Sequence, residues 1–195
     1  MSHEPEQVTP FAPDDPLLKI AVAMFERDGW IDLRFLAKAA GIGRATLYRR
    51  YGDRDRILGE VIWALSAPSI ATLRPEFRGR GADGLAEMIG KLLHASAGHS
   101  GMRAFVGQHT DTALRVMTSK HGVIQQRFIT RIAAAIRQEI GEPPDIDATT
   151  LAYAITRLGE SFYYRELITG DPPDIDAATV IIRRLLTYPA SHRTA

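Results

Sequence analysis

The sequence of 195 residues contains no cysteine. Disulfide bridges, zinc sites built on thiolates and thiol nucleophiles are therefore excluded. Long apolar runs are missing as well, because no stretch approaches the ~18 consecutive apolar residues of a membrane-spanning helix. The opening stretch MSHEPEQVTPFAPDDP is acidic and rich in proline, and it lacks the apolar core of a secretion signal. These absences predict a cytoplasmic protein with no membrane partner.

A strong excess of one charge is also missing, since 24 basic residues stand against 23 acidic ones and the net charge is +1. The charges are unevenly distributed, however. Residues 19–56 hold nine basic and five acidic side chains, which leaves the remainder of the chain net acidic. A basic segment of this kind is typical of a surface that binds nucleic acid, although many such segments are only solvated.

The alternation of apolar and polar residues that marks a half-buried strand is missing throughout. Apolar residues recur instead at helical spacing, which predicts an all-α fold of about nine helices. Asp15 and Asp32 are expected to cap the first two helices, which Gly29 and Gly41 end. The predicted ranges are 16–28, 33–40, 44–51, 53–67, 82–97, 101–117, 122–140, 147–169 and 176–188.

One short pattern occurs twice, as GEPPDIDATTL from residue 141 and as GDPPDIDAATV from residue 170. Two copies are too few for a solenoid, which stacks at least three. In each copy a glycine ends the incoming helix and two prolines forbid its continuation. Asp147 and Asp176 are the expected caps of the helices that follow, so the repeat delimits the last two helices.

The stretch GIGRATLYRRYGDRD, residues 41–55, connects two short predicted helices and continues through the second. Gly41 and Gly43 permit a tight turn, while Leu47 and Tyr51 supply an apolar inner face. Arginines, hydroxyl groups and one small residue remain for the outer face, where they suit phosphate oxygens and base edges. The pattern indicates a helix-turn-helix whose second helix can enter the major groove of DNA.

The longer stretches LLKIAVAMFERDGW and LRFLAKAAGIGRATLYRRYGDRDRIL, within residues 17–65, carry a family pattern. They resemble the amino-terminal domain of the TetR (tetracycline repressor) family, with its motif A-x-x-A-G-V-S-x-x-x-L-Y-x-H-F-x-x-K-x-x-L. The resemblance implies a dimeric regulator that binds double-stranded DNA, usually a repressor released by a small molecule. It further implies a flexible segment at 1–14, a three-helix helix-turn-helix domain at 15–60, and an effector-binding and dimerisation domain at 61–195.

Carried over position by position, the resemblance assigns DNA contacts to the second and third helices and to the start of the fourth. Arg50 stands where the family often has histidine, and Arg54 where it usually has lysine. Leu33 occupies a place where a hydroxyl residue commonly contacts phosphate, so no contact is transferred there, and Gly43 replaces a common serine. The predicted DNA-binding residues are Arg34, Arg44, Ala45, Thr46, Tyr48, Arg49, Arg50 and Arg54.

The last two predicted helices carry an apolar stripe with one glycine in it. Two delimited terminal helices of this kind favour a twofold four-helix interface between two copies of the chain. The alternative is that both helices pack only within their own subunit. The predicted interface residues are Leu151, Ile155, Leu158, Gly159, Phe162, Ile181 and Leu185.

Polar side chains among apolar helical positions are the candidates for an effector site. Tyr153, Arg157, Glu160 and Tyr164 share one face of the helix at 147–169, although an Arg157–Glu160 pair can be a simple helix salt bridge. The predicted effector is small and mainly apolar, with neither cofactor nor metal. Residues 105–129 are loosely similar to QsdR-type members, some of which respond to lactones, so lactone-like molecules are included. The predicted effector residues are Phe105, Gln108, His109, Arg115, Tyr153, Arg157 and Glu160.

An enzyme and a helical interaction module are the two alternatives to a regulator. An enzyme is disfavoured because GHSGM, at residues 98–102, lacks the last glycine of a serine-hydrolase elbow and does not follow a strand. The histidines are scattered, without the spacing of a metal site. A helical interaction module with a solvated basic face is the second alternative. It differs from a DNA-binding protein in having no steep salt dependence of DNA affinity.

Overall fold

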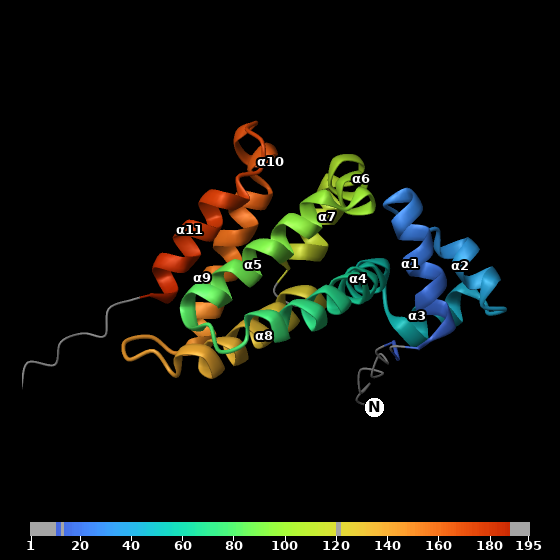
Figure 1. The fold of residues 1–195 in the computed structure, drawn as a ribbon. Coiled ribbons are helices and arrows are strands. Elements are labelled where there is room, and N and C mark those ends of the chain that lie inside the picture. The colour runs from blue at the N-terminus through green and yellow to red at the C-terminus, as the bar shows by residue number, and fades with distance from the viewer. Residues whose placement is uncertain (1–10, 13, 120–121, 188–195) are drawn as a thin grey trace, which may run out of the picture. The chain divides into compact units, whose positions relative to one another are not determined.

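The computed structural model describes residues 11–12, 14–119 and 122–187, and over these residues the chain is helical without strands (Figure 1). The predicted all-α fold is confirmed. Eleven helices lie in the described residues, two more than the sequence pattern predicted. They are α1 (Pro16–Asp28), α2 (Leu33–Ala39), α3 (Arg44–Tyr51), α4 (Arg54–Phe77), α5 (Gly81–Gly98), α6 (Ser100–Gln108), α7 (Thr110–Thr118), α8 (Val123–Ile140), α9 (Ala148–Tyr163), α10 (Arg165–Thr169) and α11 (Ile175–Leu186).

The two additional helices arise because two predicted helices are broken at a single residue. His109, with φ −132° and ψ 41°, separates α6 from α7. Tyr164, with φ −93° and ψ 17°, separates α9 from α10. Neither break falls at a glycine or proline, and the apolar periodicity runs through both. The sequence therefore contains no helix-stop signal at either position.

The fourth helix was predicted to end before Pro68, and this prediction is wrong. Helix α4 continues through Pro68 and Pro75 as far as Phe77. A proline inside a helix removes one backbone hydrogen bond, which the packing of α4 overrides here. Phe77 is buried and belongs to a large apolar core. The interval of residues 68–81 between the fourth and fifth predicted helices therefore shrinks to a short turn. The N–H groups of Gly79 in this turn and of Gly81 at the start of α5 both donate to Oε2 of Glu139 on α8.

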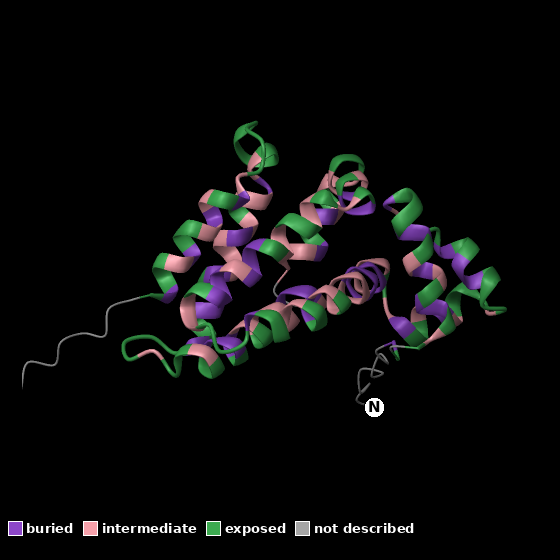
Figure 2. Cartoon of the chain, viewed as in Figure 1, coloured by how far each residue is buried: buried purple, intermediate pink, exposed green. Residues whose placement is uncertain are grey.

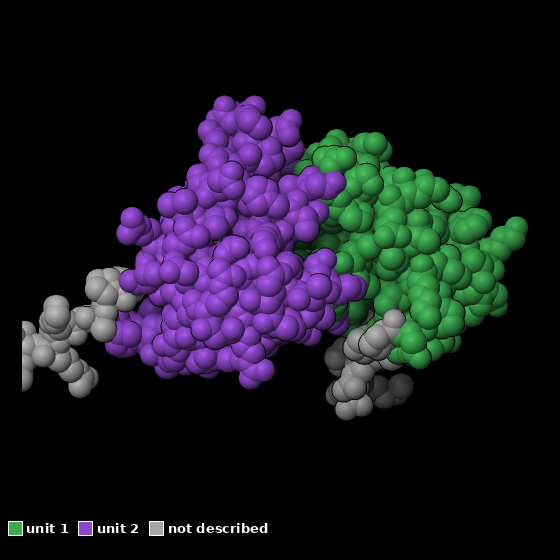
Figure 3. Space-filling model, viewed as in Figure 1, with its two compact units in different colours: residues 1–67, 99–125 green, residues 68–98, 126–195 purple. Residues whose placement is uncertain are grey.

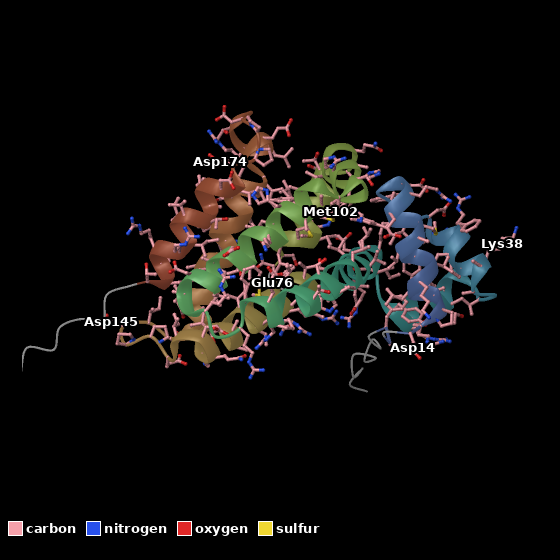
Figure 4. The ribbon with its side chains drawn as sticks, viewed as in Figure 1. Asp14, Lys38, Glu76, Met102, Asp145 and Asp174 are labelled. Atoms are coloured by element: carbon pink, nitrogen blue, oxygen red, sulfur yellow. The ribbon has the colours of Figure 1, made fainter. Side chains whose placement is uncertain are left out.

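The two copies of the repeated pattern begin their helices at different places. Asp147 caps α9 as predicted, accepting hydrogen bonds from the N–H groups of Thr149 and Thr150. In the second copy the cap is Asp174, at the start of α11 (Figure 4), and Asp176 lies within the helix, so that prediction is wrong. Burial explains the shift, because Ile175 is buried and its counterpart Ile146 is exposed.

The described residues form two compact units, coloured separately in Figure 3. Unit 1 comprises residues up to 67 together with 99–125, and unit 2 comprises 68–98 and 126–195. The division falls inside α4 and inside α8. Residues 99–125, which the sequence placed with the carboxy-terminal domain, are thus grouped by their contacts with the amino-terminal helices.

Unit 1 is built around the apolar faces of α1, α2, α3 and the start of α4, and Figure 2 shows this burial along each helix. Helix α6 packs against the end of α1 through two glycines. Gly29 ends α1 with a positive φ of 65° and lies against residues 101–105. A Cβ placed on Gly101 would come 2.5 Å from the carbonyl oxygen of Phe25, so only glycine allows this approach.

Unit 2 has a second core, in which α11 packs against both α5 and α9. Leu85, Ile136, Ile155 and Ile182 are among its most buried side chains. Phe11, within the segment predicted to be flexible, is buried, and residues 1–10 and 13 of that segment lie outside the described residues. Within the described part of the chain, no helix has the length and apolar character needed to cross a membrane.

Two alanine substitutions in α6 test the close contact between α1 and α6. Gly101→Ala should lower the free energy of unfolding by about 1–3 kcal/mol, because its Cβ must displace backbone atoms of α1. Gly107→Ala, in the same helix with open space around it, should raise stability by up to ~1 kcal/mol through helix propensity. Urea unfolding of both variants measures the difference, and equal effects would contradict the proposed packing.

Candidate nucleic-acid interface

The turn between α2 and α3 is held by backbone hydrogen bonds. Asp32 caps α2 by accepting from the N–H groups of Arg34 and Phe35. At the other end, the Ile42 N–H donates to the Ala37 carbonyl, and Gly41, at φ 66°, donates to the Lys38 carbonyl. These two bonds form a Schellman motif, which ends α2 sharply and sends the chain into α3. The predicted helix-turn-helix is therefore present.

Helix α3 is fixed to unit 1 by its inner face and by its last residue. Leu47 is fully buried, and Tyr51 is 3% exposed. The Tyr51 hydroxyl donates to Oδ2 of Asp15 at 2.9 Å, and Oδ1 of the same carboxylate caps α1. Phe11 stacks on the Tyr51 ring with centroids 4.0 Å apart. Burial, followed by the hydrogen bond and charge of Asp15, raises the pKa of Tyr51.

The outer faces of α2 and α3 carry exposed cations that form no ion pair with any described carboxylate. Lys38 projects outward from α2 (Figure 4). The guanidinium of Arg44 lies 5.9 Å from the centroid of the Tyr48 ring, and that of Arg50 lies 5.1 Å from the Tyr51 ring. The exposed set is Arg34, Lys38, Arg44, Arg49 and Arg50.

The predicted DNA-binding residues all lie on this outer surface or at its edge. Thr46, Tyr48 and Arg54 are partly exposed, while Ala45 is exposed. Leu33, to which no contact was transferred, is 1% exposed and belongs to the core. Gly43, in place of the common serine, gives α3 no side-chain cap. The backbone N–H groups of its first turn therefore have no capping side chain, which is an arrangement suited to an anion.

Trp30 links α4 to the break between α6 and α7. The His109 ring stacks on the indole with centroids 3.9 Å apart, and the Arg54 guanidinium lies 4.9 Å from the indole centroid. Trp30 is itself partly buried. The sequence signalled neither contact, because the three residues are distant in the chain.

The predicted effector residues fall in both units. In unit 1, Phe105 is fully buried in edge-to-face contact with Phe25, and Gln108 is exposed. The Arg115 guanidinium pairs with the carboxylate of Asp55 on α4, which gives it a structural partner. His109 contacts Trp30 as described above.

In unit 2, the Arg157 Nη1 atom lies 3.0 Å from Oε2 of Glu160, as the sequence spacing allowed. Tyr153 is 52% exposed. Tyr164, at the end of the same helix face, is buried and was left out of the predicted set. Its helical spacing from Glu160 and Arg157 is the sequence feature that could have placed it in that set.

The predicted dimer residues divide into buried and exposed members. Leu151 and Ile155 lie in the core of unit 2, so their side chains pack within their own chain. Gly159 is buried against Leu93 of α5, while Leu158 and Phe162 are partly buried. Ile181 and Leu185 are 38% and 36% exposed, and Val180 beside them is 52% exposed. The exposed apolar face is thus narrower than predicted and centred on α11.

The fold and this surface define a helical protein of the helix-turn-helix class. A family model described as "Tetracyclin repressor-like, C-terminal domain" matches residues 80–187, which is more than half of the chain. The chain therefore belongs to the tetracycline repressor-like family, whose members are transcriptional regulators and not enzymes. No curated protein sequence matches it.

Three solved structures share the fold. The transcriptional repressor QsdR of R. erythropolis has a TM-score of 0.79 and 22% identity, over 87% of this chain and 92% of its own. The repressor AlkX of a Dietzia species, implicated in biodegradation of n-alkanes, has a TM-score of 0.63 and 24% identity, over 92% and 96%. The multidrug binding protein EbrR, complexed with imidazole, has a TM-score of 0.54 and 16% identity, over 90% of each chain.

Two tyrosines of α3 provide a test of its anchoring. Tyr51→Phe should lower the free energy of unfolding by about 1–2 kcal/mol, because it removes a hydrogen bond to a carboxylate. Tyr48→Phe should leave stability within about 0.5 kcal/mol of the wild type, since Tyr48 lies on the outer face. Chemical unfolding distinguishes the two, and equal losses would show that Tyr48 is also part of the core.

Proposed function

We propose that this chain is a homodimeric transcriptional repressor, released from a palindromic operator when a small, mainly apolar molecule binds its carboxy-terminal domain. The observation that carries the proposal is the set of exposed cations on α2 and α3 that form no ion pair with any described residue. Arginines of unit 2 such as Arg80, Arg137 and Arg165 are ion-paired. Cations left without a described partner on a helix-turn-helix are suited to phosphates and guanine edges.

The proposed contacts follow from where each side chain lies. Arg44 and Arg49, exposed on α3, are suited to base edges or phosphates, and Ala45 lets the helix approach the groove closely. Thr46 and Tyr48 offer hydroxyl groups to phosphates. Arg50, near the end of α3, and Arg54, at the start of α4, are suited to the phosphates of the duplex, and Arg34 on α2 is suited to a base edge. Phosphate contacts of this kind fix the position of the protein, while base contacts select the sequence.

A dimer places two such helices on two half-sites of an operator. The exposed apolar residues Val180, Ile181 and Leu185 of α11 are the proposed contact between the two copies. Exposed apolar side chains grouped on one helix are typical of a protein interface. Leu151 and Ile155 contribute indirectly, because they hold α9 in its own subunit.

The proposed effector acts by a shift in population. A molecule that prefers the conformation unable to span successive major grooves lowers DNA affinity, typically with ~1–3 kcal/mol of coupling. The proposed effector is mainly apolar, lactone-like molecules included, and Arg157 and Glu160 of α9 are its candidate polar contacts within unit 2. The fold neighbour AlkX, a repressor implicated in biodegradation of n-alkanes, supports an apolar molecule.

DNA binding is tested by fluorescence anisotropy on the duplex upstream of the protein's own gene, against a scrambled duplex. Affinity for the operator should exceed that for the scrambled duplex by about 10³-fold or more and should fall steeply with salt. Weak, equal binding to both duplexes calls for selection from random DNA. If that selection returns no motif, the proposed regulator is refuted.

The variant Arg49→Ala should weaken operator binding by about tenfold and reduce the salt slope by about one for each half-site. Its matched control is Arg184→Ala, an exposed arginine of α11 with no ion pair among the described residues. Removing Arg184 should leave the affinity unchanged. Equal losses in the two variants would show that general charge, and not α3, attracts the DNA.

The dimer is tested by light scattering after size exclusion at micromolar concentration. Wild type should be a dimer, and the double variant Ile181→Glu, Leu185→Glu should be a monomer, because four carboxylates would meet in the interface. Ile146→Glu, at an equally exposed isoleucine of the turn before α9, should remain a dimer. A monomeric wild type would exclude the proposed arrangement.

A further inference from the structure

Tyr164 is a buried phenol whose hydroxyl group has no hydrogen-bond partner among the described residues. The residue is 3% exposed and lies between α9 and α10. Its backbone is fully used, since the N–H donates to the Glu160 carbonyl, and the carbonyl accepts from Leu167 and Ile168. The backbone hydrogen bonds thus fix the position of the residue, while its hydroxyl group forms no hydrogen bond with any described residue.

A buried hydroxyl without a partner is unfavourable, because it loses water and gains nothing in return. Phenylalanine would fill the same volume without this cost. A tyrosine here therefore points to a partner that is absent from the free chain, either an ordered water or a bound molecule.

Polar residues of α9 lie near Tyr164, and a serine of α5, also in unit 2, contacts one of them. Arg157 and Glu160 precede Tyr164 by seven and four residues, which places all three on one face of the helix. Their side chains are 36% and 16% exposed. The Tyr163 ring meets the Tyr164 ring edge to face at 4.9 Å, and the Ser96 hydroxyl of α5 donates to the Tyr163 hydroxyl at 3.4 Å.

The phenol is protonated at neutral pH even without these neighbours, since the ordinary pKa of tyrosine is about 10. Burial, followed by the nearby Tyr163 and the charge of Glu160, raises the pKa of Tyr164 well above its ordinary value. The hydroxyl group therefore stays protonated at neutral pH and can donate one hydrogen bond. Arg157 already neutralises Glu160, so little positive charge remains to attract an anion.

We infer that Tyr164 donates a hydrogen bond to a neutral carbonyl group of the effector, an amide or an ester, with Arg157 and Glu160 at the same polar end. The inference rests on the proposed function, since it concerns the molecule that releases the regulator. The Arg157–Glu160 pair leaves no net positive charge to hold a carboxylate ligand, and a pure hydrocarbon would leave the hydroxyl group without a partner.

The test uses four probes with the same chain and different heads: octanamide, methyl octanoate, octanoate and octane. Binding is measured by thermal unfolding and calorimetry without DNA. Octanamide and methyl octanoate at saturation should raise the melting temperature of wild type by about 4 °C or more, and octanoate and octane should not. Tyr164→Phe should weaken binding of the two neutral carbonyl probes about tenfold.

The free Tyr164→Phe variant should melt at or above the wild-type temperature, because the lost hydroxyl group has no partner among the described residues. The control is Ser161→Ala, which removes an exposed hydroxyl of the same helix bonded only to the Leu158 carbonyl. This variant should bind the probes like wild type.

The inference is overturned by any of three results: no response to either carbonyl probe, an equal response to octanoate, or unchanged probe binding by Tyr164→Phe. A clear drop in the melting temperature of the free Tyr164→Phe variant would also refute it. If DNA binding is selective and one of these results is found, the proposed regulatory function stands and only the neutral carbonyl effector is refuted. If the probes bind but DNA binding is not selective, the proposed regulatory function is refuted and the carbonyl-binding site at Tyr164 stands.

Discussion

The exposed cationic surface of α2 and α3 depends on the hydrogen bonds of the Asp15 carboxylate. One oxygen caps α1 and the other accepts the Tyr51 hydroxyl at the end of α3. Helix α3 has eight residues and no side-chain cap, so by itself it would be only marginally helical in water. Its geometry comes from Leu47, Tyr51 and this carboxylate, and the outer face is then free to carry unpaired cations.

A second constraint is the glycine contact between α1 and α6. Gly29 and Gly101 bring the two backbones so close that α6 is part of the same packed unit as the helix-turn-helix. Trp30 extends this contact, since it touches both His109 and Arg54. The helices that follow the DNA-binding segment in sequence are thus partly its structural support, and this grouping differs from a boundary drawn at residue 60.

Charge is used differently in the two units. Several arginines of unit 2 are matched with carboxylates, as in Arg137 with Glu142 and Arg165 with Asp171, so these add little field beyond their own pair. On α2 and α3 the cations face solvent. The net charge of +1 conceals this difference, and for that reason the distribution of charge was more informative than its sum.

The sequence by itself determined the helical class, the helix-turn-helix and its cationic face, because helix period, caps and glycine turns are local properties. Asp15, Asp32 and Gly41 act as their positions predicted. The tertiary structure alone decided that α4 continues through two prolines, that α11 begins at Ile175, and that Leu151 and Ile155 are core. These outcomes depend on burial against residues far away in the chain, as does the unpaired hydroxyl of Tyr164, and local pattern carries no information about such contacts.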